Sequence, residues 1–321
     1  MKKALLPLII ASVLPAAAFA EVVVYGKANV ALQNTDKSVS DETYTEVVSN
    51  ASRIGLKGSE VNNDDLKAIY QFEYETKVDD GNQSSNGSAQ TFAQRNIYVG
   101  LQGSGGTGMI GMFDTPLKVA QEKVDLFNDL AGDLKTVLHG EVRAKNVVQY
   151  ATPAFSNITA TLAYVNTEKD ATDVSDGYSA SVAYSTKELY LALAADQNSD
   201  FASKQTVHAD DVEILRAVAR YTVGPVVLGA IYETYEYNTI DEDGYLASAQ
   251  WNINSEWAVK GQYVQSDMMY DGGTSTSIGG DYKLSKATKL FAYATKVEND
   301  IEVGADAADN TYVGVGIELN F

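Results

Sequence analysis

Cysteine is absent from this chain of 321 residues, and histidine occurs only twice. Without cysteine the chain forms no disulfide framework and offers no thiolate to a metal ion. The two histidines, His139 and His208, are too few for a three-histidine metal site. Both lie in predicted loops, without an obvious partner for nucleophilic catalysis. We therefore expect no metal, no other cofactor and no enzymatic activity.

Long apolar runs are almost as scarce. Residues 4–14 form one at the N-terminus, after two lysines and before the small residues Ala18-Phe19-Ala20. This run is too short for a transmembrane helix, which needs ~20 apolar residues, but it has the three parts of a secretory signal peptide. We predict that residues 1–20 are cleaved and that residues 21–321 form one exported domain. No later run approaches ~18 residues, so a membrane could be crossed only by barrel strands, which alternate in polarity.

Basic residues are in the minority. The chain has 24 Lys and Arg against 43 Asp and Glu, and its formal net charge is −19. Nucleic acid is therefore not an expected partner, because its phosphates would be repelled. The acidic balance fits a soluble secreted protein as well as a cation-favouring channel, so charge alone does not decide between them.

Apolar residues alternate with polar residues or glycine along most of the chain after residue 20. In the C-terminal segment, Val313, Val315, Ile317 and Leu319 form one apolar face. A period of two residues indicates strands with one polar and one apolar face. The pattern predicts an all-β chain of about sixteen strands. They cover residues 22–34, 46–59, 66–78, 91–103, 107–114, 144–152, 157–167, 176–186, 188–197, 211–223, 225–238, 243–254, 256–268, 274–284, 288–298 and 310–321.

The connections between these strands alternate between short turns and longer acidic loops. Residues 62–65 and 254–255 are examples of the turns, and residues 79–90 and 298–309 are examples of the loops. An up-and-down barrel of a bacterial outer membrane has short turns at one end and longer loops at the other. The three later prolines all fall in connections, and the 20 tyrosines suit two membrane interfaces. We therefore predict a transmembrane antiparallel β-barrel in the outer membrane of a Gram-negative cell.

The longest connection, residues 114–140, has an apolar stripe of its own. Leu117, Val124 and Leu134 are among the apolar residues that recur in it at helical spacing. This spacing indicates one or two helical turns after Pro116. A loop with an apolar stripe must pack on something, and a wide barrel offers its inner wall. We expect this loop to fold inward.

Several short motifs occur in an order and at spacings that coincide with the predicted strands. They are Val24-Tyr25-Gly26-Lys27, Ser52-Arg53-Ile54-Gly55-Leu56-Lys57-Gly58, Arg95-Asn96-Ile97-Tyr98-Val99-Gly100-Leu101, Phe113-Asp114-Thr115-Pro116, Asn146-Val147-Val148-Gln149-Tyr150-Ala151-Thr152-Pro153 and the terminal Phe321. Over essentially the whole chain after residue 20, this set resembles the general (trimeric) porins of Gram-negative bacteria. The resemblance implies a homotrimer, a third loop folded into each barrel, and passive diffusion of small hydrophilic solutes and ions.

The resemblance also implies a constriction at which acids on the third loop face basic residues on the wall. Lys27, Arg53 and Arg95 match the positions of the family's basic cluster, and Arg143 is a fourth candidate. Alternation independently turns Lys27 and Arg53 away from the lipid face. The strand at residues 91–103 alternates poorly, so Arg95 rests on the motif alone.

The acidic candidates are Asp114, Glu122, Asp125, Asp129 and Asp133. Glu122, Asp125 and Asp129 are three and four residues apart, which would place them on one side of a helical turn. Opposed acidic and basic surfaces would orient dipolar solutes and disfavour apolar ones. The alternative is that these acids form an ordinary solvated face.

Two departures from the family pattern bear on selectivity. The loop lacks the Pro-Glu-Phe-Gly-Gly motif of the enterobacterial members, and Met112 stands where many relatives have arginine. With acids in excess, we expect a mild cation preference. Two other functions remain open at this point. One is a substrate-specific channel, for instance for an oligosaccharide that stacks on Tyr25 and Tyr150, and the other is an acidic surface β-protein that binds partners through its loops.

The C-terminal Phe321, with apolar residues alternating before it, resembles the signal by which barrel precursors are recognised during outer-membrane assembly. It also ends the strand that we expect to close the barrel beside the first strand. The expected partners are other copies of the chain, the barrel-assembly machinery, outer-membrane lipid and lipopolysaccharide, and small polar solutes.

Overall fold

Strands make up most of the fold, which is known from a computed structural model. The structure describes residues 21–38, 40–63, 65–80, 83–85, 88–90, 92–166, 176–197, 212–237, 240–267, 273–299 and 308–321. The predicted signal peptide, residues 1–20, and His208 lie outside the described residues. In the described part of the chain, no helix has both the length and the apolar character needed to cross a membrane.

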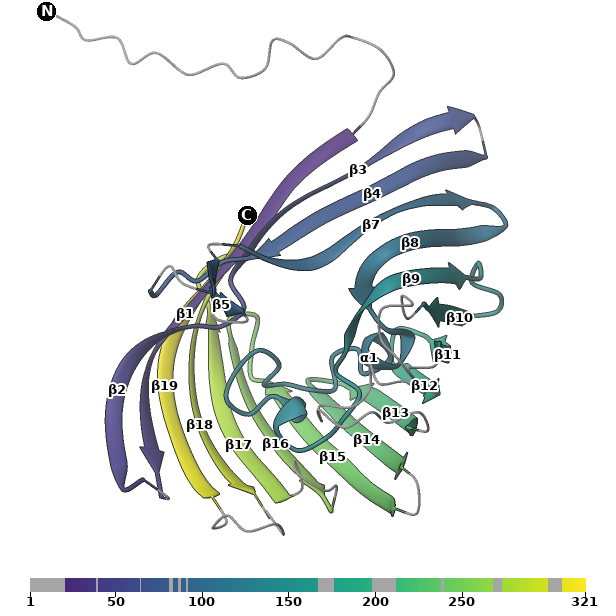
Figure 1. The fold of residues 1–321 in the computed structure, drawn as a ribbon. Coiled ribbons are helices and arrows are strands. Elements are labelled where there is room, and N and C mark those ends of the chain that lie inside the picture. Colours follow the sequence, from purple (N-terminus) through teal and green to yellow (C-terminus); the bar gives the residue numbers. More distant parts are fainter. Residues whose placement is uncertain are drawn as a thin grey trace, which may run out of the picture.

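One antiparallel sheet of 17 strands closes on itself (Figure 1). Its strands are β1 (Glu21–Lys37), β2 (Glu42–Ser49), β3 (Arg53–Asn63), β4 (Leu66–Glu75), β7 (Ala93–Gly103), β8 (Gly106–Asp114), β9 (Arg143–Ala151), β10 (Ile158–Val165), β11 (Gly177–Ser185), β12 (Leu189–Gln197), β13 (Glu213–Val223), β14 (Val226–Tyr237), β15 (Ile240–Asn252), β16 (Trp257–Ser266), β17 (Gly273–Lys283), β18 (Thr288–Asn299) and β19 (Ala308–Asn320). Apart from β2 and β3, which both pair with β1, each strand pairs with the next along the chain, and β19 closes the barrel by pairing with β1.

The second barrel strand is built from two pieces. β2 and β3 pair with successive parts of β1, so the 17 strands form a barrel of 16, as predicted. The interruption lies at residues 50–52, where Ala51 has a left-handed φ of 49°. There Ser52 Oγ accepts a hydrogen bond from the Asn29 N–H at 3.0 Å and donates one to the Asn29 carbonyl at 3.1 Å. These bonds satisfy backbone groups of β1 beside the break.

A small hairpin of β5 (Gln83–Ser85) and β6 (Ser88–Gln90) stands apart from the barrel sheet, between β4 and β7. It was not predicted from the alternation of residues. Strands of three residues are too short for a period of two to be recognised.

Alternation separates a lipid-facing surface from the inner wall. In β12, Leu191 and Leu193 are exposed on the outside of the barrel, whereas Tyr190, Ala192 and Ala194 are buried inside it. An apolar outer surface is what the hydrocarbon of a bilayer requires of a barrel. The predicted apolar face of the C-terminal strand is confirmed in the same way, since Val313, Val315 and Ile317 of β19 are exposed.

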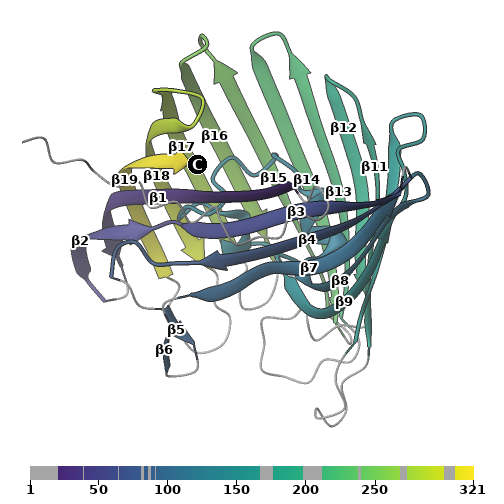
Figure 2. The same cartoon turned by 90° about the horizontal axis from the view of Figure 1, so that it is seen from above.

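The connections fall at two ends of the barrel (Figure 2). Short turns join β7 to β8 and β13 to β14, whereas residues 76–92 join β4 to β7 at the opposite end. Two connections at that opposite end are shorter than predicted. Residues 38–41 join β1 to β2, because both strands extend beyond their predicted bounds on this side, and residues 238–239 join β14 to β15, because β15 begins earlier than predicted.

Residues 115–142, hereafter the long loop, fold into the barrel as predicted (Figure 1). The loop begins with helix α1 (Pro116–Ala120), which Thr115 caps, and later forms the 3₁₀ turn η1 (Leu134–Thr136). Leu117 and Val124 are fully buried against inward-facing apolar residues of β12 to β16. The inner wall therefore has an apolar sector that the long loop covers.

Candidate functional site

A cavity of about 820 Å³ lies inside the barrel, between the long loop and the wall. The wall side, including Lys77 two residues after β4, contributes four cations and two anions to its lining. These are Arg53, Lys77, Arg95, Arg143, Glu75 and Asp114. The long loop contributes two cations and four anions, which are Lys118, Lys135, Glu122, Asp129, Asp133 and Glu141. The wall side of the cavity thus carries a net charge of +2 and the loop side −2.

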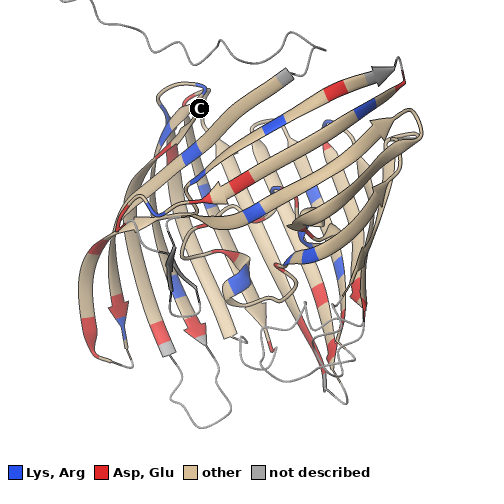
Figure 3. Ribbon diagram, turned by 45° about the horizontal axis from the view of Figure 1, so that its top comes forward, with Lys and Arg blue, Asp and Glu red and all other residues tan. Residues whose placement is uncertain are grey.

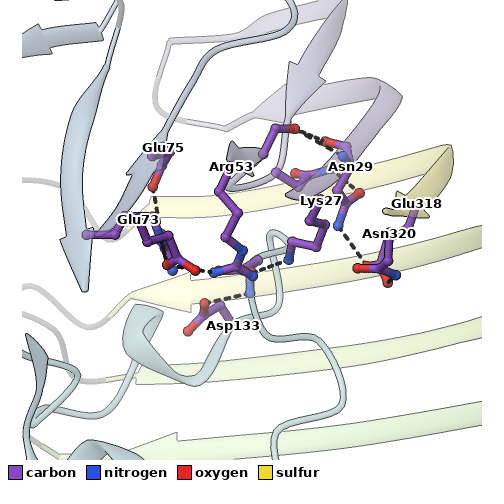
Figure 4. Close-up of polar contacts among 12 residues, drawn as sticks. Lys27, Asn29, Arg53, Glu73, Glu75, Asp133, Glu318 and Asn320 are labelled. Carbon is purple, nitrogen blue, oxygen red and sulfur yellow. Dashed lines mark hydrogen bonds and ion pairs between the residues drawn. The ribbon is translucent and has the colours of Figure 1, made fainter. Parts of the chain in front are cut away.

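Asp129 is the loop acid that reaches the wall. Its Oδ2 lies 2.6 Å from Lys27 Nζ and 3.2 Å from Arg53 Nη2. Lys27 and Arg53 are direct neighbours on β1 and β3, and Figure 4 shows both side chains extending from the wall towards the loop. Burial alone would raise the pKa of Asp129, but Lys27 and then Arg53 hold this pKa below its ordinary value. Three residues predicted for the site therefore meet at one point.

Arg95 faces the lumen because the pairing of β4 with β7 is irregular. The register shifts at Glu73, so that β7 presents two residues, Arg95 and Asn96, opposite this one residue of β4. Arg95 Nε lies 2.9 Å from Glu73 Oε1, and Arg95 Nη1 lies 2.7 Å from Glu75 Oε2. The acids beside Arg95 thus come from the neighbouring strand and not from the loop. Neither glutamate was among the residues predicted for the site.

Arg143 and Asp114 stand at the two ends of the long loop. They pair across β8 and β9, with Arg143 Nη2 at 3.0 Å from Asp114 Oδ1. Asn96 and Lys118 complete the cluster, since Arg143 Nε donates to Asn96 Oδ1 at 2.9 Å and Lys118 Nζ lies 3.2 Å from Asp114. Asp114 was grouped with the loop acids, but it is the last residue of β8 and belongs to the wall.

The prediction that a helical turn aligns Glu122, Asp125 and Asp129 is wrong. α1 ends at Ala120, and Glu122 and Asp129 have left-handed φ values of 50° and 68°. The three side chains consequently point to different places. Glu122 Oε2 lies 3.0 Å from Arg220 Nε on β13, on a different part of the wall from Lys27 and Arg53.

Asp125 lies outside the cavity lining and is only 6% exposed. Its carboxylate accepts the backbone N–H groups of Phe127 at 2.9 Å and Leu134 at 3.0 Å, so it holds the loop's own turn together. Burial, and after it the neighbouring Asp133, raises the pKa of Asp125 to about 7. Asp133 does line the cavity, and it caps η1 by accepting the Lys135 N–H at 3.0 Å. Asp125 therefore has a place inside the loop instead of the pore-facing place that was predicted for it.

Phe321 lies where the barrel closes, as expected for the end of a closing strand. Its backbone N–H donates to the Gly26 carbonyl at 3.0 Å, and the Gly26 N–H donates to the Phe321 carbonyl at 2.8 Å. The Phe321 ring lies over Gly26, so that a Cβ at this glycine would overlap the ring. The first and last strands are thus joined by the backbone and by a ring seated on a glycine.

Tyr150 does not share the lumen with Tyr25, as the sugar-stacking alternative requires. Its ring is 49% exposed and belongs to the apolar outer surface, where it lies with Val148 and Leu162. Tyr25 faces inward and donates a hydrogen bond to Glu73 Oε2 at 2.9 Å. The predicted pair of stacking tyrosines is therefore wrong, because the two rings lie on opposite faces of the barrel wall.

Comparisons with known proteins agree with the barrel fold. A family model described as "Gram-negative porin" matches residues 7–302. The chain is 26% identical to the major outer membrane protein P.IB of Neisseria sicca, over 100% of this chain and 90% of that protein.

Solved structures with the same fold include an anion-selective porin from Comamonas acidovorans. It has a TM-score of 0.79 and 22% identity, and the match covers 94% of this chain and 100% of that one. In-vitro folded OmpT of Vibrio cholerae, solved in a trimer form, has a TM-score of 0.64 and 16% identity over 94% of this chain and 99% of that one.

Proposed function

This chain belongs to the Gram-negative porin family and forms a passive diffusion channel for small hydrophilic solutes and ions in the outer membrane, and we propose that the cavity between the wall and the long loop is its constriction. Lys27, Arg53, Arg95 and Arg143 form the basic side. Asp129 and Asp133 form the acidic side, together with Glu122 from the earlier part of the loop. Asp125 and Asp114 act differently, as a brace inside the loop and as the partner of Arg143.

The observation that carries this proposal is the division of charge across the cavity, +2 on the wall and −2 on the loop. Opposite charges on the two sides of a narrow passage produce a field across the direction of flow. A solute with a dipole lowers its energy by turning in this field, whereas an apolar solute gains nothing and loses hydration. The constriction therefore favours small polar solutes and ions over apolar ones of equal size.

We propose a mild cation preference, which arises outside the constriction. The charges that line the cavity cancel, but the strand ends beside the longer connections are mostly acidic in β1, β2, β13 to β15, β18 and β19 (Figure 3). The acids there are Asp36, Glu42, Glu46, Glu213, Glu236, Asp241, Glu242, Asp243, Glu298 and Asp309, and the lysines are Lys37 and Lys296. An acidic entrance concentrates cations before they enter the pore. The anion selectivity named for the Comamonas protein is not expected here.

Reversal potentials in a planar bilayer under a salt gradient test this proposal. Wild type should favour K⁺ over Cl⁻. Arg53→Glu should shift the potential further towards the cation side, because it changes the charge at the cavity by two. Lys286→Glu makes the same change at an exposed turn residue outside the cavity and should shift the potential much less. Equal shifts in the two variants would show that charges at the cavity have no special effect on ion passage, and the cavity would then not be the constriction.

We further propose that the protein is a homotrimer, consistent with the trimer form in which the Vibrio neighbour was solved. Residues 1–20 are cleaved during export, Phe321 is recognised by the barrel-assembly machinery, and lipopolysaccharide surrounds the barrel. The chain acts as a channel without enzymatic activity. A heat-modifiable oligomer in a detergent extract, on a gel, is the expected signature of the trimer, and a monomer band alone would exclude it.

A further inference from the structure

Arg216 is a fully buried cation on β13, behind the long loop and outside the lining of the cavity. Its three guanidinium nitrogens have separate partners. Nε lies 2.6 Å from Glu233 Oε2 on β14, Nη1 lies 2.8 Å from Glu141 Oε1, and Nη2 donates to the His139 carbonyl at 2.6 Å. Glu141 and His139 both belong to the long loop. One side chain therefore binds the wall and the loop at once.

The same contacts extend to both ends of the loop. Glu233 Oε1 accepts the His139 N–H at 3.0 Å, so the wall holds this stretch of backbone through two bonds. Glu141 Oε2 accepts a hydrogen bond from Gln121 Nε2 at 2.9 Å, and Gln121 directly follows α1. We call Arg216, Glu233, Glu141 and the His139 backbone the loop anchor. The loop anchor thus connects two wall strands to the beginning and the end of the long loop.

The local backbone allows both loop partners of Arg216, His139 and Glu141, to reach it. Gly140 separates them and has a left-handed φ of 79°, which favours glycine. A Cβ at this position would overlap Leu117 and lie 3.2 Å from Arg216 Nη2. Arg216 is fully buried, and residues close to the anchor in sequence, Leu138 and Ile214, belong to the apolar core under the long loop. A buried charge that loses its partner in such a place is strongly destabilising.

We propose that Arg216 is a positioning residue that sets the shape of the constriction without touching the pore. Its partner Glu141 and the next residue in the chain of contacts, Gln121, both line the cavity. Fixing these two residues also fixes the loop segment between them, which carries Glu122, Asp129 and Asp133. This inference rests on the proposed constriction, because it assigns a cause to the position of the acidic side.

The test uses a variant that can fold without the anchor. Arg216→Met alone would leave Glu233 buried without a cation, so Glu233→Gln is added to remove the unpaired charge from the wall. The matched control is Arg220→Met, which removes an arginine four residues further along the same strand that also pairs with a loop acid, Glu122. That pair is partly exposed, so its loss should loosen the loop far less.

A nitroxide label reports the motion of the loop directly. The chain has no cysteine, so Val119→Cys provides a single labelling site at a loop residue that is 62% exposed in the cavity. In the Arg216→Met/Glu233→Gln protein, the detached population of the loop should rise about a hundredfold or more. The label's spectrum should gain a mobile component, and the open channel should show conductance substates that wild type lacks.

The control separates this inference from the proposed constriction. Arg220→Met should keep an immobile label while shifting the reversal potential towards cations, since it removes a charge near the cavity. A wild-type spectrum and a steady current in the double variant would overturn the role of Arg216, and so would equal loosening in the control. If the double variant loosens the loop but Arg53→Glu leaves selectivity unchanged, only the proposed constriction fails.

Discussion

Asp129 is the residue on which the two sides of the constriction meet. It is the loop carboxylate that contacts both Lys27 and Arg53, at 2.6 Å and 3.2 Å. The contacts are largely buried, with 14% of the Asp129 side chain exposed, so salt screens them less than surface pairs. Removing this one charge should alter both the electrostatics of the cavity and the hold on the loop.

Asp129→Asn should therefore shift the reversal potential towards anions, because Lys27 and Arg53 lose their counter-charge. The matched control is Asp125→Asn, which makes the same chemical change four residues earlier on a buried side chain outside the cavity. That control should leave the reversal potential near its wild-type value. If Asp125→Asn shifted the reversal potential more than Asp129→Asn in bilayer recordings, Asp125 would be the pore-facing acid.

Asp125 should give the long loop a dependence on pH. Its pKa is raised to about 7 in the folded protein, so the folded state binds the proton more tightly than the unfolded state does. The stabilisation from this proton is complete below the ordinary carboxyl pKa of ~4 and is lost as the pH rises through about 7. Hydrogen exchange of loop peptides, corrected for intrinsic rates, should show less protection at high pH. If Asp125→Asn showed the same pH dependence of exchange protection, that dependence would belong to another group.

Sequence reasoning at this scale was correct where alternation decided the outcome. Lys27 and Arg53 face inward because their neighbours along β1 and β3 face outward. It failed for Glu122 and Asp125, because helical spacing in a sequence does not reveal the left-handed residues that end a helix. It also could not find Arg216, whose partners are 17 and 75 residues away in sequence.

At the scale of the element, the long loop behaves as part of a packed core. Phe127 is fully buried and lies beneath Lys260, whose Nζ is 4.9 Å from the ring centre. Phe127→Ala should cost about 3 kcal/mol or more of loop packing. Exchange protection should fall in the long loop while the strands keep theirs. Val119→Ala, at an exposed loop position, should leave the exchange protection of both the long loop and the strands unchanged. A loss of loop protection in Val119→Ala would mean that packing does not hold the loop.

The seam between β1 and β19 depends on a glycine that the Phe321 ring covers. Gly26→Leu should hinder closure of the barrel, because its side chain would occupy the place of the ring. The heat-modifiable folded band on a gel should weaken. Gly105→Ala, at a turn where a Cβ meets no atom within 4 Å, serves as the control and should fold normally. Full folding of Gly26→Leu would show that barrel closure does not require the contact between the Phe321 ring and Gly26.

The sequence predicted which strands exist and in what order they follow better than it predicted where each strand begins and ends. The second strand was expected at residues 46–59, whereas β2 and β3 together cover residues 42–63 with a break. The break is set by the hydrogen bonds between Ser52 and Asn29. Such contacts between distant segments leave no local period in the sequence.

At the scale of the whole molecule, the barrel was predictable because its physical requirement is repeated in every strand. Each strand must present apolar residues to lipid, and pairing with two neighbours leaves no free edge. The distribution of charge was predictable only in part. The acidic excess is visible in the composition, but the cancellation of charge inside the cavity depends on Glu75, Lys77 and Lys118, which only the fold brings there.

The central claim is that ions cross the membrane through the cavity between the wall and the long loop. The most direct measurement is the single-channel conductance of Val119→Cys before and after a bulky cationic thiol reagent, with labelling confirmed by mass spectrometry. Val119 lines the cavity and is 62% exposed, whereas Phe155, 80% exposed in the connection between β9 and β10, provides a control outside it. We predict a stepwise fall in conductance for labelled Val119→Cys and none for labelled Phe155→Cys. Unchanged conductance in fully labelled Val119→Cys would contradict the account.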